Sequence, residues 1–321
     1  MPKYIFLVIL FSVFVSCNKK SAFEKEIELL PVDLKIERFD KILYETPISE
    51  FKSMRSKYAV FFPEEYHDSV FVDKIQDPIY RELYDEVQKK YSDFSSVQNE
   101  IEDLYRHIKF YFPDFKMPSK VITLISEMEY QNKVILTDSI MLLSIDLYLG
   151  KDHKFYINEF PSYFCQTFER SQILPDIVSE FSTKVTTPAR DRMFLSQMIY
   201  YGKELYLKDI LLPEYADNDK IGYTKEQLEW CEANENYMWL NFIQEAYLYS
   251  TDLKLVHRFI APAPFSKFYL DIDNESPGRV GIWLGWQIVR SFMKNNDVSL
   301  QQLLAMDAKE LFELSRYKPK K

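Results

Sequence analysis

Glycine is scarce in this chain, and that scarcity limits the possible folds more than any other feature. Only six glycines occur among 321 residues, although 47% of the residues are hydrophobic and 16% are aromatic. Tight hairpin turns and phosphate-binding loops both depend on glycine, because its backbone adopts conformations that other residues avoid. A long apolar chain with so few of these turns is most easily folded as helices around a sizeable core. We therefore predict an α+β protein that is predominantly helical.

The charge balance excludes one broad class of partner. The chain carries 40 Lys and Arg residues against 49 Asp and Glu residues, a formal net charge of −9. Proteins that bind nucleic acids concentrate basic residues on one face to neutralise phosphates. The sequence also contains neither a P-loop nor a glycine-rich dinucleotide fingerprint. We therefore predict that neither a nucleic acid nor a nucleotide is bound.

A short apolar segment near the N-terminus is typical of a signal peptide. Lys3 precedes an almost unbroken apolar run over residues 4–15, which as a helix would be about 18 Å long. A helix that spans a bilayer needs about 20 apolar residues, so this run is too short to be a membrane span. We predict a signal peptide over residues 1–16.

The end of this segment resembles the bacterial lipobox, in which a cysteine becomes the acylated first residue of the mature chain. Ser16 precedes Cys17, although Phe14 stands where leucine is usual. The resemblance implies palmitate and related acyl chains on Cys17, which together anchor a protein stably. A short polar tether over residues 17–30 would then join the membrane to a domain that faces the periplasm. The alternative is an ordinary signal peptide followed by an incidental cysteine.

Periodicity predicts one strand and several helices in the first third of the chain. Apolar and charged residues alternate over residues 32–39, as expected for a half-buried strand. Apolar residues recur every three or four positions over Ser49–Tyr58, Pro78–Tyr91 and Ser96–Tyr111. That spacing favours helices with one apolar face.

The pattern changes in the middle of the chain. Three short β-type runs lie between residues 119 and 148 and are separated by polar turns, and the helical pattern returns after Phe160. We predict a small β-sheet followed by a helical half. Because no linker or repeat interrupts the sequence, we expect a single α+β domain over residues 31–321.

No local pattern of histidine or cysteine predicts a metal or a cofactor. The four histidines lie far apart, so no His-Glu-x-x-His pair occurs on one helix. Besides Cys17, the chain has Cys165 and Cys231, which either form a disulfide or remain as two buried thiols. We predict no cofactor.

An acidic cluster precedes the last long helical segment. It consists of Asp271, Asp273 and Glu275. One interpretation is a site for a cation, because carboxylates are the ligands that hard cations prefer. The other is a solvated loop whose negative charge caps the following helix.

A series of glycines follows directly. Gly278, Gly281 and Gly285 are spaced three and four residues apart in an apolar, aromatic sequence. This spacing places small residues on one face of a helix. We therefore predict that another helix packs closely against this face.

Several long and distinctive motifs occur in the second half of the chain. They include Tyr-Tyr-Gly-Lys-Glu-Leu-Tyr-Leu-Lys-Asp within residues 188–213, Ser-Pro-Gly-Arg-Val-Gly within 276–290, and the segments over 223–239 and 264–269. In these motifs the chain resembles the gliding-motility lipoprotein GldB family, and the similarity extends over nearly its whole length. The resemblance implies a membrane-anchored envelope protein that is required for gliding motility. Its partners would be proteins of the gliding or secretion machinery, and the resemblance implies no biochemical activity.

The order of a small sheet and two helices is also similar to families of predicted zinc-dependent peptidases. In those proteins a His-Glu-x-x-His motif on the first helix and a glutamate before glycine on the second hold zinc. Here Ser179 and Thr183 stand in the histidine positions, and Glu180 stands in the position of the general base. Tyr201, which precedes Gly202, stands in the position of the third ligand.

This second resemblance implies a degenerate zincin-like architecture, a pseudo-peptidase without metal. Zinc lowers the pKa of its bound water to about 7, and without zinc the hydrolytic nucleophile is lost. The former cleft would then be kept as a binding surface. The alternative is that Ser179 and Glu180 belong to an ordinary amphipathic helix.

Two functions follow from these observations. A non-enzymatic lipoprotein would bind a partner through an aromatic groove. The tryptophans available for such a groove are Trp230, Trp239, Trp283 and Trp286. The alternative is a metal-dependent peptidase-like hydrolase whose metal is held by acidic groups such as Asp271 and Asp273. The missing histidine pair favours the non-enzymatic function.

Overall fold

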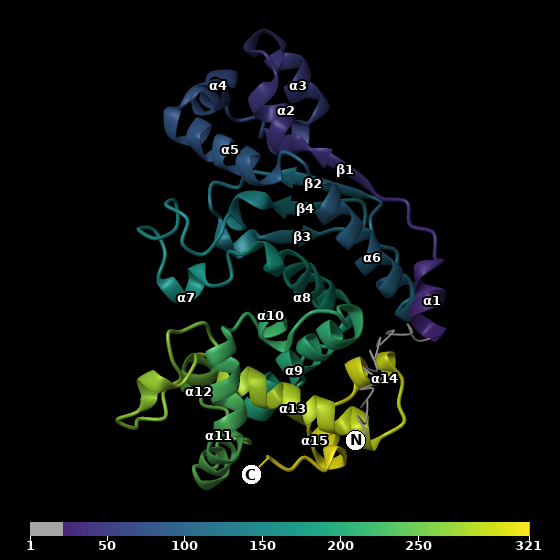
Figure 1. Ribbon diagram of the computed structural model, residues 1–321, viewed down its shortest axis with the longest axis vertical. Coiled ribbons are helices and arrows are strands. Elements are labelled where there is room, and N and C mark those ends of the chain that lie inside the picture. Colours follow the sequence, from purple (N-terminus) through teal and green to yellow (C-terminus); the bar gives the residue numbers. More distant parts are fainter. Residues whose placement is uncertain (1–21, 321) are drawn as a thin grey trace, which may run out of the picture.

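The computed structural model describes residues 22–320, in which helices surround one small sheet near the middle of the molecule (Figure 1). The predicted signal peptide over residues 1–16 and the predicted lipidation site at Cys17 lie outside the described residues. Between residues 22 and 320, no helix is both long and apolar enough to cross a membrane.

The sheet has four strands in the order β1-β2-β4-β3. Their bounds are β1 Lys35–Arg38, β2 Lys120–Leu124, β3 Val134–Leu136 and β4 Met141–Ser144. The first three in this order run parallel, and β3 pairs antiparallel to β4 at the edge. The strands predicted over residues 32–39 and within 119–148 are therefore confirmed, and they form one mixed sheet.

Alternate residues of β2, one of the two inner strands, face opposite layers of helices, because successive side chains of a strand point to opposite faces of the sheet. Val121 packs into one buried cluster together with residues of α5 (Pro78–Tyr91) and α6 (Ser95–Tyr111). Ile122 packs into another cluster, which residues 39–84 cover. Figure 1 shows this second layer at the top of the molecule. The sheet is thus buried on both faces.

The three helices predicted before the sheet are confirmed with small changes at their ends, as α3 Phe51–Lys57, α5 and α6. The structure also has three helices here that were not predicted, α1 Ala22–Glu28, α2 Phe39–Glu45 and α4 Asp68–Gln76. A short 3₁₀ turn over Ile48–Glu50 replaces the first turn of the helix predicted over residues 49–58. Helix α5 begins at Pro78 because the Asp77 carboxylate accepts a hydrogen bond from Ile79 N at 2.8 Å and proline tolerates the first helical position.

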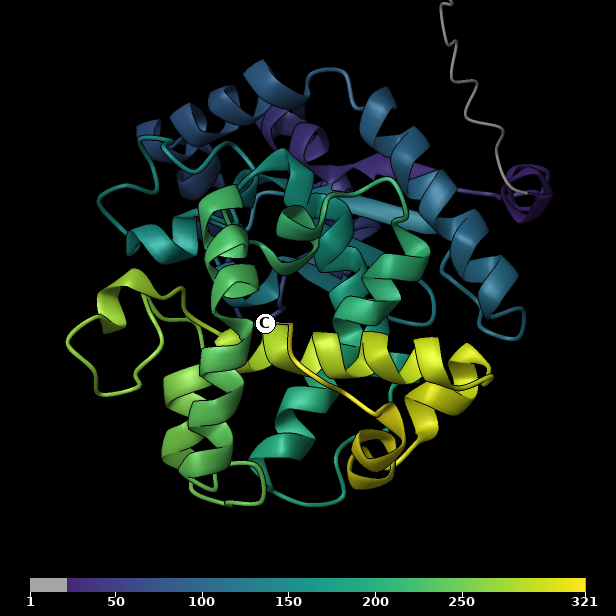
Figure 2. The same ribbon diagram turned by 60° about the horizontal axis from the view of Figure 1, so that its bottom comes forward.

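The half after residue 160 is helical, as predicted. Its helices are α7 Ser162–Cys165, α8 Ile173–Val185, α9 Phe194–Leu211, α10 Asp217–Ile221, α11 Lys225–Gln244, α12 Leu253–Phe259, α13 Val280–Asn295, α14 Leu300–Ala305 and α15 Ala308–Ser315. Turning the molecule brings α13 to the front of this half, with α11 crossing near one end (Figure 2). A separate buried cluster fills the space between α9, α11, α13 and α15.

Helices α9 and α13 meet backbone to backbone through glycine. A Cβ atom on Gly285 would lie 1.9 Å from Met198 O, and one on Gly202 would lie 2.5 Å from Gly285 C and O. The predicted close packing at Gly281 and Gly285 is therefore confirmed. The prediction that Gly278 shares this helix face is wrong, because Gly278 precedes α13 in a turn and packs against Ala263 O instead.

Candidate functional site

A polar cleft lies between the sheet and the helical half. It has a volume of about 320 Å³ and is lined by the start of β3, the α7 region, α8, α9, α10 and the turn before α13. Six charged side chains reach it: Lys133, Asp176, Glu204, Lys208, Lys220 and Arg279. This volume is at the lower end of the range for ligand pockets, roughly 300 to 1,000 Å³.

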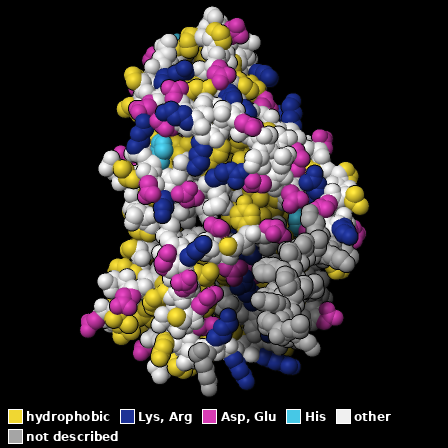
Figure 3. All heavy atoms as spheres, viewed as in Figure 1, with side chains coloured by type: hydrophobic (Ala, Val, Ile, Leu, Met, Phe, Trp, Pro, Cys, Tyr) yellow, Lys and Arg dark blue, Asp and Glu magenta, His cyan; other side chains and the backbone are white. Residues whose placement is uncertain are grey.

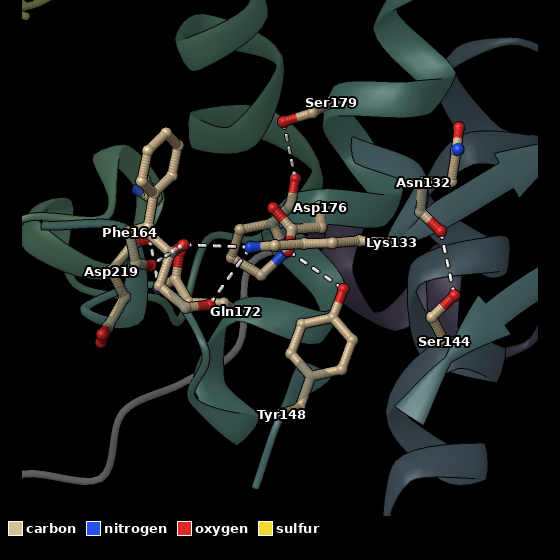
Figure 4. Close-up of polar contacts among 12 residues, drawn as sticks. Asn132, Lys133, Ser144, Tyr148, Phe164, Gln172, Asp176, Ser179 and Asp219 are labelled. Atoms are coloured by element: carbon tan, nitrogen blue, oxygen red, sulfur yellow. Dashed lines mark hydrogen bonds and ion pairs between the residues drawn. The ribbon is translucent and has the colours of Figure 1, made fainter. Parts of the chain in front are cut away.

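Lys133 and Asp176 form the first ion pair of the cleft. Lys133 Nζ lies 3.1 Å from Asp176 Oδ2 and also donates to Thr167 Oγ1 at 3.0 Å. The Tyr148 hydroxyl donates to the same carboxylate oxygen at 3.0 Å, and Figure 4 shows both groups converging on Asp176. Burial and then the Asp176 charge raise the pKa of Tyr148 well above its usual value, so the hydroxyl remains a donor.

Ser179, Glu204 and Lys208 form a second network on the facing helices α8 and α9. Ser179 Oγ donates to Glu204 Oε1 at 2.6 Å and can instead donate to Pro175 O at 3.0 Å. Lys208 Nζ lies 3.1 Å from Glu204 Oε1 and donates to Lys220 O, also at 3.1 Å. Because Lys208 is buried, its charge is balanced by this carboxylate rather than by water.

Lys220 belongs to a third network, which extends behind the cleft. Its Nζ lies 3.0 Å from Asp209 Oδ1, and Arg290 bridges Asp209 and Asp217 with contacts of 2.7 Å to each. Arg290 also stacks on Trp286, with its guanidinium carbon 3.7 Å from the ring centroid. Two cations and two carboxylates therefore compensate one another here.

These networks pair the charged and polar groups of the cleft with one another. The Ser179 hydroxyl has no histidine partner, and the carboxylate beside it is already paired with Lys208. A serine nucleophile needs an adjacent base that is free to take its proton. Over residues 22–320, no group of three or more His, Cys, Asp or Glu side chains is arranged to hold a metal ion.

The structure separates the residues of the zincin-like comparison. Of the five, Ser179 alone is among the residues that line the cleft. Glu180 pairs with Lys184 at 3.4 Å, and Thr183 is exposed and donates to Glu180 O. Tyr201 is half-buried against the α9–α13 cluster, and Gly202 contacts α13.

The α9 residue that meets Ser179 is Glu204, one helical turn after Tyr201. The sequence-based prediction missed this partner because it aligned Tyr201 and Gly202 with the Glu-Gly pair of the zinc-dependent peptidases. The signal was available in the sequence: residues three apart share a helix face, so Glu204 lies on the same face of the helix as Tyr201.

The acidic cluster closes a turn. Asp273 accepts hydrogen bonds from the backbone N–H groups of Phe268, Tyr269 and Leu270 at 3.1, 2.8 and 3.2 Å. Asp271 and Glu275 are exposed. The prediction that this cluster caps the following helix is wrong, because α13 starts later and its N-cap, Arg279, makes no side-chain capping bond.

The same turn forms one wall of an apolar groove. Helix α11 supplies Trp230, Tyr237 and Met238, and the turn supplies Phe268, Leu270 and Ile272. Tyr237, Leu270 and Ile272 are 71%, 57% and 55% exposed, which is unusual for side chains of this size. Figure 3 shows hydrophobic and acidic side chains gathered on the lower left of the molecule, where α11 and α12 lie in Figure 1.

The tryptophans and cysteines divide between surface and core. Trp230 lines the groove, Trp239 packs on Tyr317 with a centroid distance of 5.1 Å, and Trp283 and Trp286 are buried. Only the first of the four candidate tryptophans therefore forms part of the groove. Cys165 and Cys231 are both buried and unpaired. Of the two alternatives, they are therefore two buried thiols and not a disulfide.

One of three comparisons with known proteins identifies a family. Residues 20–319 match the family described as "Gliding motility protein GldB", which is nearly the whole chain. No curated protein matches the chain significantly. No solved structure matches it significantly either. The chain belongs to the gliding motility protein GldB family and is thereby a lipoprotein related to gliding motility.

Proposed function

We propose that this protein is a non-enzymatic binding component of the gliding machinery. Acyl chains on Cys17 would hold it in the cell envelope, with its domain in the periplasm and in contact with the associated secretion machinery. The observation that carries the binding role is the apolar groove between α11 and the turn over residues 268–276.

The groove has the character of a protein-binding surface. Large apolar side chains that stay exposed beside one another mark interaction sites on soluble domains. The wall formed by the turn is held in place rather than loose, because Arg258 Nε donates to Lys267 O at 2.6 Å and its guanidinium lies 4.4 Å from the Tyr269 ring centroid. A partner therefore meets a preformed surface, which lowers the entropic cost of binding.

Charge around the groove specifies the partner. Glu226 lies four residues before Trp230, and Glu245 lies four residues after Asn241. This spacing places both glutamates on the helix face that lines the groove. Asp271 and Glu275 are exposed on the opposite wall. The complementary partner is a protein segment with apolar residues flanked by Lys or Arg.

The polar cleft supports the absence of catalysis. Its carboxylates are engaged by Lys133 and Lys208, and its one candidate nucleophile, Ser179, has no free base. A hydrolase would need at least one of these groups to titrate independently near neutral pH.

The groove is tested by two substitutions in the full chain, Tyr237→Ser and Leu270→Ser, in a gliding bacterium. Both should reduce cell spreading while leaving the protein's abundance unchanged, because the side chains are exposed. Val60→Ser is the matched control, since Val60 is 76% exposed and lies on a distant 3₁₀ turn. Normal spreading by both groove variants would refute the groove as the partner site.

The hydrolase alternative is tested by Glu180→Gln. We expect this variant to spread normally, because Glu180 has no catalytic task in the proposed function. Loss of spreading with normal abundance would contradict a purely binding role and favour the peptidase-like activity.

A further inference from the structure

We infer that the polar cleft binds a small ligand that carries a single carboxylate group, with Arg279 as its counter-ion. This inference goes beyond the proposed function, which concerns the apolar groove. It starts from the charges that line the cleft.

All the charged side chains of the lining except one are compensated by a neighbour. Lys133 pairs with Asp176, Lys208 pairs with Glu204, and Lys220 pairs with Asp209. In the part of the chain that the structure describes, Arg279 forms no ion pair. The cleft therefore retains one positive charge on a protein whose net charge is −9.

The Arg279 guanidinium is held in place with most of its donors available. Its Nη2 donates to Ile221 O at 2.7 Å, and its central carbon lies 5.5 Å from the Tyr223 ring centroid. A guanidinium has five N–H donors in a fork that matches a carboxylate. One hydrogen bond and one ring contact thus orient the guanidinium and leave its other N–H donors available to a ligand.

The backbone at this position indicates that the side chain is needed. Arg279 has a φ of 63°, in the left-handed region where glycine or asparagine is normally preferred. A Cβ atom on the preceding Gly278 would lie 2.2 Å from Ala263 O, so close packing fixes the turn. A large side chain kept at a strained position that lines a cleft is typical of functional residues.

The charge count favours a carboxylate over a phosphate. One uncompensated guanidinium matches one negative charge, whereas a phosphate dianion would remain half-neutralised in a partly buried cleft. The rest of the lining supplies neutral hydrogen-bonding groups, including Gln166 and Gln227, and the rings of Tyr163 and Phe164. These features suit a small polar acid such as the C-terminal residue of a peptide.

The test uses the full-length protein in detergent and needs no variant for its first step. The probes are a panel of N-acetylated amino acids and the corresponding primary amides, and binding is measured by ligand-observed NMR at millimolar concentration. At least one acid should bind, and its amide should bind at least about tenfold more weakly, since the amide lacks the charge. Equal binding of acid and amide, or binding of no acid, would overturn the inference.

Two variants then locate the site. Arg279→Gly should abolish binding of the acid while it keeps the fold, because glycine suits the left-handed backbone. Arg279→Gln provides a second loss of charge with a side chain retained, and Lys267→Gln is the control, an exposed cation outside the cleft lining. Wild-type binding by either Arg279 variant overturns the assignment, and so does displacement of the acid by inorganic phosphate more readily than by acetate.

Discussion

The sheet-bearing half and the helical half of the molecule are held together in different ways. In the sheet half, the fully buried carboxylates of Asp40 and Asp146 fasten loops and strand ends to one another. In the helical half, the backbones of α9 and α13 approach each other closely at Gly202 and Gly285. Four short strands form hydrogen bonds between only a few of their backbone N–H and C=O groups. Helices form their backbone hydrogen bonds internally, so two helices need only to pack closely against each other.

The two carboxylates show how the sheet half is held. Asp40 accepts hydrogen bonds from Arg38 at 2.7 and 2.8 Å and from Gln88 and Thr123 at 2.9 and 2.6 Å. Asp146 accepts from Ser126 N at 2.9 Å and from Met128 N at 2.8 Å. Met128 has a φ of 65°, so the carboxylate stabilises a turn that the backbone alone would not favour.

The largest effect is expected at the glycine contact. In Gly285→Ala, the new Cβ atom would meet the fixed carbonyl of Met198 and force α9 and α13 apart, which should lower the free energy of unfolding by more than about 3 kcal/mol. Gly281→Ala is the graded control, because its Cβ atom would lie 2.9 Å from Phe259 O and demands a smaller shift. Urea denaturation followed by circular dichroism gives both values, and a smaller loss for Gly285→Ala than for Gly281→Ala would contradict the role of this contact.

A slightly smaller effect is expected at Asp40. The substitution Asp40→Asn keeps the shape of the side chain but leaves Arg38 without its counter-charge, at a cost of about 3 kcal/mol. Asp33→Asn is the matched control on an exposed residue and should change stability by less than about 0.5 kcal/mol. If the two variants have the same urea midpoint, buried carboxylates do not hold the sheet half.

The smallest of the three effects is a dependence on pH. Burial raises the pKa of Asp146 to about 6, above the usual value of 3.8, despite the hydrogen bonds that it accepts. Between these values the folded state binds more protons than the unfolded state, so the free energy of unfolding should fall as the pH rises from about 4 to 6. The loss should be on the order of 2 kcal/mol.

Asp146→Asn isolates this contribution from those of other carboxylates. The variant should lose the decline between pH 4 and 6, and the difference between wild type and variant at each pH gives the effect of this one group. An unchanged slope in the variant would show that other groups cause the dependence.

Local periodicity predicted several elements correctly, because each signal depends on neighbouring residues. The alternation over residues 32–39 and the apolar stripe of Pro78–Tyr91 both reflect burial of one face, and the structure has β1 and α5 there. The parallel pairing of β1 with β2 was not predicted. Its partners are far apart in sequence, so no local pattern encodes their register.

The site was harder to predict for a related reason. The contact between Ser179 and Glu204 depends on how α8 and α9 face each other, and an alignment to a family motif selected Tyr201 instead. Arg279 was overlooked because the glycines around it were interpreted as one helix face. Its proposed role depends on the turn at Gly278 and on the absence of an acidic partner among the described residues, which only three-dimensional packing reveals.

The docking of α1 limits how far the domain can move from an anchor. Ile27 is fully buried, and the Phe23 ring meets the Phe110 ring of α6 at a centroid distance of 6.3 Å. Much of the tether predicted over residues 17–30 is therefore part of the folded body. Between Cys17 and Ala22 the chain reaches at most about 18 Å when fully extended. If Cys17 is acylated, the folded domain would therefore stay close to the bilayer, with α1 as the helix nearest to the point of attachment.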